Sequence, residues 1–210
     1  MGKDSDFITG SLLGGIFGWL LGSSRFKEWE DFIKNFEKRL NHLAYFKVII
    51  PIGLYPKIRN FYREGVLSYL FGLPNSSVPM LIKSLEIGVK EKYKKEEKKD
   101  PPKNWNLYNL IEWCEQYLGR KKELAHGFRI LRNIIHEEKS LKEQDALECI
   151  RHTSEILVEL FPFSTCKWGI ECTCRNDIEV LIEREKAYIG NVLTVTCNRC
   201  KSQISFTVMP

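Results

Sequence analysis

The spacing of the cysteines constrains the fold of this chain more than any other feature. Seven cysteines occur among 210 residues. The first two, Cys114 and Cys149, stand singly within helical patterns, where a thiol packs as a small apolar side chain. The other five lie at positions 166–200 and include two close pairs. An odd number of cysteines crowded into one short segment favours a metal site over a disulfide framework and indicates a reducing compartment.

The two close pairs predict a zinc-ribbon-like module. Cys197 and Cys200 enclose two residues, the spacing of a turn in which two thiolates bind one ion. Cys172 and Cys174 enclose one residue, and Cys166 stands six positions before Cys172 as a substitute ligand. We expect a structural zinc ion on Cys172, Cys174, Cys197 and Cys200, because four thiolates leave no open position and the module is too small to fold on its own core. Free or disulfide-bonded cysteines are the alternative.

The composition and the hydrophobic periodicity predict a mainly α protein with this small β module at its end. A hydrophobic fraction of 43% supports a packed core and excludes global disorder. Helical spacing is found over 26–43, 58–71, 75–93, 106–118, 121–138 and 144–160. Short loops between amphipathic helices indicate an antiparallel bundle over residues 26–160. β-rich runs at 178–182, 192–196 and 204–208 assign residues 161–210 to the metal module.

Local signals predict where these helices begin and end. Asn75, Ser76 and Ser77 are expected to cap the third helix, with Pro79 in its first turn. The charged run 94–103 is expected to be a solvated helix end and loop, with contact to a nucleic acid as the alternative.

Residues 1–25 form a separate glycine-zipper segment. Positions 7–24 carry no charge, and glycines recur every four residues, at Gly10, Gly14, Gly18 and Gly22. An 18-residue helix would be about 27 Å long, close to the hydrocarbon thickness of a bilayer. Arg25 and Lys27 follow the run, so a membrane anchor would leave the rest of the chain in the cytoplasm, at the inner face of the cell membrane. The alternative is a helix that packs in an oligomer, since a glycine stripe lets helices approach closely.

The helix expected at 121–138 carries a polar stripe. Its members recur at i, i+3, i+4 and i+7, namely Arg129, Arg132, Asn133 and His136. Lys122 and His126 extend this face toward the start of the helix, and Leu124 and Leu131 lie opposite.

This combination of side chains suits phosphate chemistry. An imidazole can take a proton from a ribose 2′-OH or give one to the leaving oxygen. Guanidinium groups stabilise the negative charge that develops on phosphorus oxygens. No carboxylate cluster stands in the stripe, so the chemistry would need no metal ion. A solvated helix face is the alternative reading, and the net charge of +5 is compatible with a polyanionic partner without requiring one.

Several segments of residues 26–160 resemble the HEPN superfamily. The sequence at 131–138 is LRNIIHEE, followed at 144–157 by QDALECIRHTSEIL. Earlier segments are YLFGLPNSSVPMLIKSLEIGVK at 69–90 and NLYNLIEW at 106–113. The likeness is greatest to uncharacterised branches found near prokaryotic defence systems. It implies an antiparallel helical bundle and, in active members, a metal-independent endoribonuclease whose homodimer brings two sites together.

The resemblance also implies roles for single residues. The signature of active members is Arg, then a polar residue, then His after four to six intervening positions. His136 would be the acid or base and Asn133 the polar partner. The arginine is either Arg129, with six intervening residues but followed by Ile130, or Arg132, with three. We therefore expect an RNA-cleaving homodimer in antiviral defence or a toxin role. The alternatives are a non-catalytic scaffold, or a membrane-associated effector that oligomerises through its glycine-rich helix.

Overall fold

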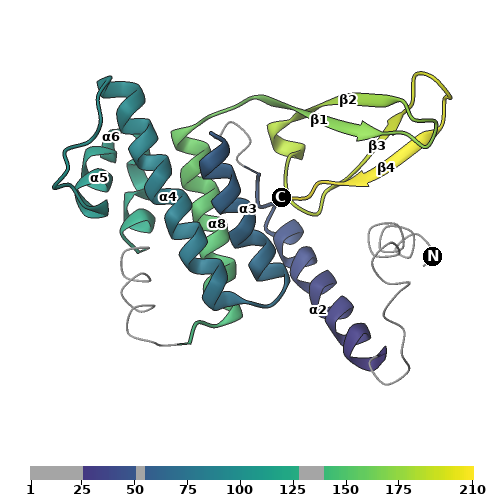
Figure 1. The fold of residues 1–210 in the computed structure, drawn as a ribbon, viewed down its shortest axis with the longest axis horizontal. Coiled ribbons are helices and arrows are strands. Elements are labelled where there is room, and N and C mark those ends of the chain that lie inside the picture. Colours follow the sequence, from purple (N-terminus) through teal and green to yellow (C-terminus); the bar gives the residue numbers. More distant parts are fainter. Residues whose placement is uncertain (1–25, 51–54, 128–139) are drawn as a thin grey trace.

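The computed structural model describes residues 26–50, 55–127 and 140–210 of the chain. This part is mainly helical, with a small antiparallel β region at its C-terminal end, as the sequence predicted (Figure 1). The helices are α2 (Phe26–Tyr45), α3 (Pro56–Leu70), α4 (Pro74–Glu97), α5 (Leu107–Trp113), α6 (Glu115–Leu118) and α8 (Glu143–Leu160).

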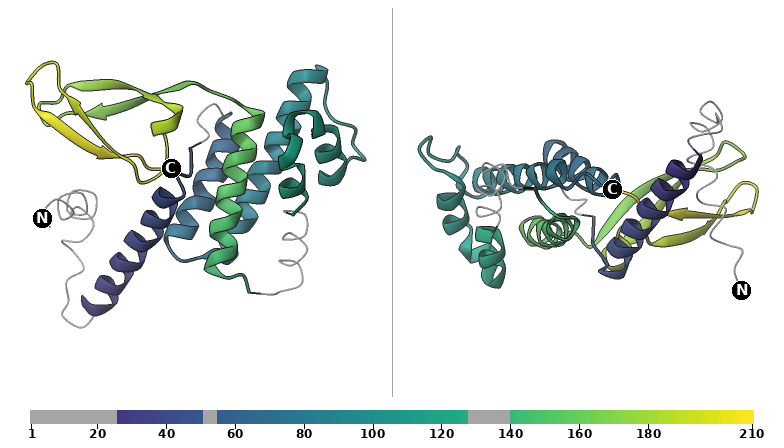
Figure 2. Two further views of the ribbon diagram at one scale, coloured as in Figure 1. Left: turned by 180° about the vertical axis from the view of Figure 1, so that it is seen from behind. Right: turned by 90° about the horizontal axis from the view of Figure 1, so that it is seen from below.

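The centre of the helical part is formed by α3, α4 and α8, which lie side by side in both views of Figure 2. Their inward faces supply fully buried side chains such as Ile58, Leu85, Ile150 and Leu157. A Cβ atom on Gly65 would stand 2.7 Å from Cγ of Leu81, so α3 and α4 can approach this closely only because the side chain is absent. The bounds of α3 and α8 agree with the predicted ranges 58–71 and 144–160 to within one or two residues.

The start of α4 corrects the sequence analysis. The helix begins at Pro74, whose missing N–H is not needed in the first turn, and Pro79 therefore lies inside the helix. The side chains of 75–77 do not cap it. Instead, Oδ1 of Asn75 accepts the backbone N–H of Leu141 at 2.8 Å, and the hydroxyl of Ser77 donates to the carbonyl of Gly65 at 2.7 Å. These side chains hold α4 to its neighbours.

The far end of α4 falls within the predicted helix end and loop at 94–103, whereas the following helix differs from prediction. Charged pairs four residues apart, such as Lys92 with Glu96 at 2.8 Å, extend α4 to Glu97, and Lys98 ends it in the left-handed conformation at φ +56°. The helix predicted at 106–118 is divided into α5 and α6 at Cys114. Asn106 caps α5 by exchanging two 3.1 Å hydrogen bonds with Asn109. A short 3₁₀ helix, η1 (Gly119–Lys121), then leads into helical residues 122–127.

The C-terminal region consists of two separate antiparallel hairpins. β1 (Thr165–Glu171) pairs with β2 (Asp177–Glu183), and β3 (Val192–Thr196) pairs with β4 (Gln203–Thr207). A 3₁₀ helix, η2 (Arg184–Lys186), begins the link between the hairpins. β2, β3 and β4 match the predicted runs, whereas β1 was not predicted.

The β module is joined to the helices through the segment that follows α2. The backbone N–H of Ile50 donates to the carbonyl of Ala187 at 2.8 Å, and that of Ile189 donates to Val48 at 2.9 Å. At Gly190, with φ +83°, a Cβ atom would stand 2.8 Å from the Cβ of Ala44. The end of α2 and the link between the hairpins are therefore in direct contact.

Among the helices of the described residues, none is both long and apolar enough to cross a bilayer. The glycine-rich run 7–24 lies outside the described residues, so the expected anchor or oligomer helix stays a prediction.

Candidate metal centre and polar helix face

The four predicted metal ligands come together at the tips of the two hairpins. Cys172 and Cys174 lie in the turn between β1 and β2, and Cys197 and Cys200 lie in the turn between β3 and β4. Their four sulfur atoms all lie within 4.8 Å of one another. Residues 28 positions apart in sequence thus form one cluster.

The distances between the sulfur atoms match a tetrahedral ion. The sulfur of Cys172 is 3.6 Å from that of Cys200, and Cys174 is 3.7 Å from Cys197. Four sulfur atoms bonded at about 2.3 Å to one tetrahedral zinc ion would stand about 3.8 Å apart. A disulfide requires about 2.05 Å, and all four cysteines are free. The donor set therefore fits a structural metal ion.

The backbone explains how two unequal cysteine spacings make equivalent turns. The N–H of Arg175 donates to the carbonyl of Cys172 at 2.7 Å, and the N–H of Lys201 donates to the carbonyl of Cys197 at 2.9 Å. Arg175 and Lys201 each follow the second cysteine of their pair, and both have positive φ, at +59° and +64°. In each turn, the residue after the second cysteine donates its N–H to the carbonyl of the first cysteine. The turn at Cys172 and Cys174 makes this hydrogen bond with one residue fewer than the turn at Cys197 and Cys200.

Polar side chains link the two turns. The amide of Asn176 lies 2.9 Å from Oδ1 of Asn198 and 3.8 Å from the sulfur of Cys197. The hydroxyl of Ser202 lies 2.9 Å from the sulfur of Cys200 and 3.7 Å from that of Cys172. These groups orient the sulfur atoms from outside the cluster, as the partners of metal ligands do.

The thiols affect one another electrostatically. The backbone N–H of Cys174 and the hydroxyl of Ser202 lower the pKa of Cys172 to about 6. Burial and the neighbouring thiols raise the pKa of Cys174 to about 12, because a second thiolate would stand beside the first. A bound cation would remove this opposition by neutralising the shared negative charge.

The remaining cysteines are separate from the cluster. Cys166 is buried, and its thiol faces the carbonyl of Ile182 at 3.5 Å, so the interpretation of Cys166 as a substitute ligand is wrong. Cys114 and Cys149 are buried among apolar side chains, as predicted, and burial raises the pKa of each thiol to about 12.

The four predicted catalytic residues all belong to one segment of the chain. Arg129, Arg132, Asn133 and His136 fall within 128–139, outside the described residues.

Lys122 and His126, which extend the face of the polar stripe toward the start of its helix, lie within the described residues. Nζ of Lys122 lies 3.1 Å from a carboxylate oxygen of Glu112 and 3.0 Å from one of Glu115. Nε2 of His126 lies 2.9 Å from the other oxygen of Glu112, and its ring is 5.2 Å from that of Tyr108. Lys122 and His126 therefore share one face, as their four-residue spacing predicts. This face is turned toward α5 and is half-buried.

The two glutamates are functional-site candidates that the sequence analysis missed. Glu112, on α5, stands ten residues before Lys122 and fourteen before His126, and Glu115, on α6, stands seven residues before Lys122. The helix is interrupted at Cys114 and again at η1 between these residues, so the tertiary fold brings the glutamates to this face. The other ring nitrogen of His126, Nδ1, is buried and has no hydrogen-bond partner among the described residues.

No family model, curated protein or solved structure matches this chain.

Proposed function

We propose that Cys172, Cys174, Cys197 and Cys200 hold one zinc ion whose role is structural. The observation that carries this proposal is the set of sulfur separations of 3.6 Å and 3.7 Å at the hairpin tips. The choice of zinc follows from the donor set, since a closed tetrahedron of four thiolates is the arrangement that structural zinc prefers in proteins.

We further propose that the chain is a HEPN-type endoribonuclease that cleaves RNA without a catalytic metal ion, as a homodimer. The support is the resemblance over residues 26–160 together with the polar stripe. The observation that bears most directly on it is that Lys122 and His126 lie on one face and both bind Glu112. Steps of three or four residues, which keep to one helix face, continue in the sequence to Arg129, Asn133 and His136.

The reaction follows from these side chains. A base removes the proton of the ribose 2′-OH, the 2′-oxygen attacks phosphorus, and the 5′-oxygen leaves with a proton from an acid. The products are a 2′,3′-cyclic phosphate and a 5′-hydroxyl. His136 would serve as the acid or base, and Arg129 or Arg132 would stabilise the charge on the phosphorus oxygens.

The experiment compares His136→Ala with His42→Ala, which removes a histidine from α2 outside the stripe. Cleavage of a labelled RNA is measured in EDTA, with zinc content checked to show that the metal centre is retained. We expect loss of about a hundredfold or more for His136→Ala only. RNA with 2′-deoxyribose at the cleaved position should remain intact.

Equal cleavage by both variants, or none by the native chain, would contradict the nuclease and favour a scaffold role. If the native chain is toxic and His136→Ala is equally toxic, while Gly14→Leu with Gly18→Leu is harmless, the membrane-effector alternative is favoured.

A further inference from the structure

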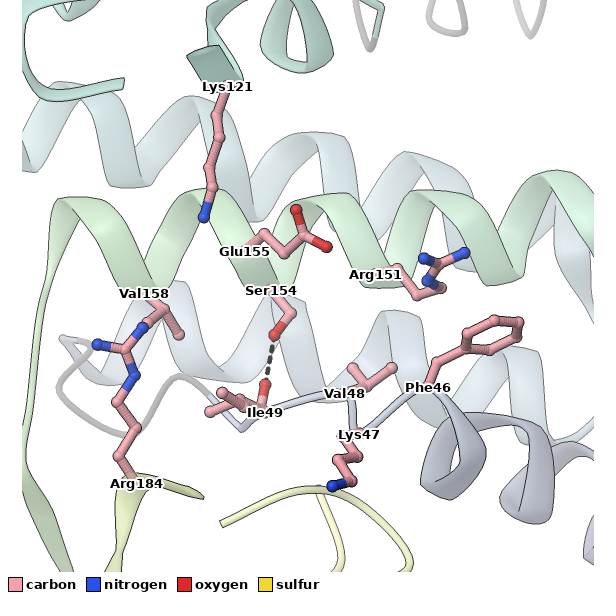
Figure 3. Close-up of a pocket in the computed structure, with 10 residues that line it drawn as sticks. All are labelled: Phe46, Lys47, Val48, Ile49, Lys121, Arg151, Ser154, Glu155, Val158 and Arg184. Carbon is pink, nitrogen blue, oxygen red and sulfur yellow. Dashed lines mark hydrogen bonds between the residues drawn. The ribbon is translucent and has the colours of Figure 1, made fainter. Parts of the chain in front are cut away.

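A small basic pocket lies where the helical part meets the β module, away from the cysteine cluster (Figure 3). Its volume is about 90 Å³, enough for several water molecules. Four segments distant in the sequence line it: the turn after α2, η1, the middle of α8, and η2. The hydroxyl of Ser154 on α8 donates to the carbonyl of Ile49 and holds one wall in place.

Positive charge gathers around this pocket. Lys47, Lys121, Arg151 and Arg184 line it, one from each of the four segments, and Glu155 is the one acidic side chain in the lining. Figure 3 shows them distributed around the turn of α8 that carries Ser154 and Glu155. Lys121 also pairs with Glu159 at 2.9 Å. The two carboxylates, Glu155 and Glu159, therefore offset only part of the four positive charges, and the pocket keeps a net positive charge.

The two arginines retain free hydrogen-bonding capacity. Within the described ranges, neither Arg151 nor Arg184 forms an ion pair with a carboxylate. The guanidinium of Arg151 lies over the ring of Phe46, 4.1 Å from its centre, which holds the plane of the group while its N–H edge stays available. Both arginines are half-buried, so an anion bound between them would be partly screened from water.

Lys47 owes its position to the end of α2. Its φ of +47° lies in the left-handed region, and its N–H donates to the carbonyl of Ala44 at 2.9 Å while that of Val48 donates to Leu43 at 3.1 Å. This turn ends the helix and brings Lys47 to the rim, opposite the side from which Lys121 enters (Figure 3).

We propose that this pocket binds a phosphate ester, with the guanidinium fork of Arg151 available at one end, that of Arg184 at the other, and Lys47 and Lys121 supplying further charge. Planar guanidinium groups match the oxygen geometry of phosphate and bind it through paired hydrogen bonds. The ligand class is a phosphate ester, either a phosphodiester of an RNA strand or the phosphate of a free nucleotide. The proposal stands on the described residues and does not rest on the nuclease.

The full-length chain is titrated with two probes, a fluorescently labelled single-stranded RNA followed by anisotropy and ATP followed by calorimetry. The double variant Arg151→Ala/Arg184→Ala should weaken binding at least tenfold. The matched control is Arg63→Ala with Arg59→Ala, which removes the same charge from exposed positions on α3 and should change binding less than twofold. The probe whose affinity falls selectively identifies the source of the phosphate.

Glu155→Gln tests the same pocket without removing a contact to Phe46. This substitution removes one negative charge from the lining, so it should tighten phosphate binding severalfold. Thermal unfolding of each variant checks that the fold is kept. Equal weakening by the α3 control, absence of tightening in Glu155→Gln, or failure of both probes to bind the native chain would overturn the proposal.

Discussion

The helical part and the β module achieve their stability in different ways. Side chains such as Leu85, Ile150 and Leu157 between α3, α4 and α8 are completely buried, and apolar area removed from water stabilises these helices. The strands β1–β4 consist mostly of exposed and half-buried residues in alternation, with only Cys166 on β1 and Ile182 on β2 buried. The module's buried residues that join the core shared with the helices, such as Cys166, Ile182 and Ile189, do not include the cysteine cluster, where Cys172 and Cys197 are buried apart from that core. One region therefore depends on its core, and the other on a metal ion at the end where a core is absent.

The largest effect is expected from the loss of a metal ligand, which should unfold the β module and leave the helical part folded. Cys197→Ser removes one ligand, and we expect the zinc content to fall from one ion per chain to near zero. A structural zinc site contributes on the order of 10 kcal/mol to folding, so the hairpins should lose their structure while the helices remain. Metal analysis, with circular dichroism for the helices and amide exchange for the strands, measures both.

The control is Cys166→Ser, the same change in the same module at a buried cysteine outside the cluster. It should keep one zinc ion per chain. If Cys166→Ser also released the metal, the four-cysteine site would be wrong.

A smaller loss of stability, in the helical part and not in the β module, is expected from Leu85→Ala. This change leaves a cavity among fully buried side chains, and the free energy of unfolding of the helical part should fall by about 2–5 kcal/mol. The zinc content should stay unchanged. Leu181→Ala, at a side chain that is 65% exposed on β2, is the matched control and should have little effect on chemical denaturation. A comparable loss from both substitutions would refute the division into a core-dependent and a metal-dependent region.

The smallest effect concerns the polar face beside α5. The ammonium of Lys122, and next the imidazole of His126, hold the pKa of Glu112 below its ordinary value of 4.5. A carboxyl whose pKa is lower in the folded state stabilises the fold above pH 4.5, and this contribution is lost as the pH falls below that value. Glu112→Gln should therefore lower the urea midpoint slightly at pH 7 and not at pH 3. Glu123→Gln, at an exposed neighbour, should leave the midpoint unchanged at both values, and a pH-independent shift in Glu112→Gln would exclude the ion pairs as its cause.

The sequence predicted those features whose causes lie within a short stretch of residues, and it missed those that depend on contacts between distant segments. The ends of α3 and α8 follow from hydrophobic spacing within each segment, and the cysteine cluster follows from the chemistry of paired thiols. β1 was missed because its run includes Lys167 and Gly169 and becomes a strand by pairing with β2. The break at Cys114 and the proximity of Glu112 to His126 have no local signal, since both result from helices packing around one another. The role of Asn75 was misjudged because its partner, Leu141, is distant in the sequence.

The pairing of Ile50 with Ala187 has a consequence for synthesis of the chain. The two residues are separated by most of the polypeptide, and at about 5–20 residues per second the ribosome would need roughly seven to thirty seconds to pass from one to the other. During that interval the segment 48–50 has emerged without the backbone partner that it will have in the finished molecule. A chain truncated before the hairpins would leave those amides and carbonyls bonded to water alone, so the segment 48–50 reaches its final backbone pairing only after the last quarter of the chain has been made.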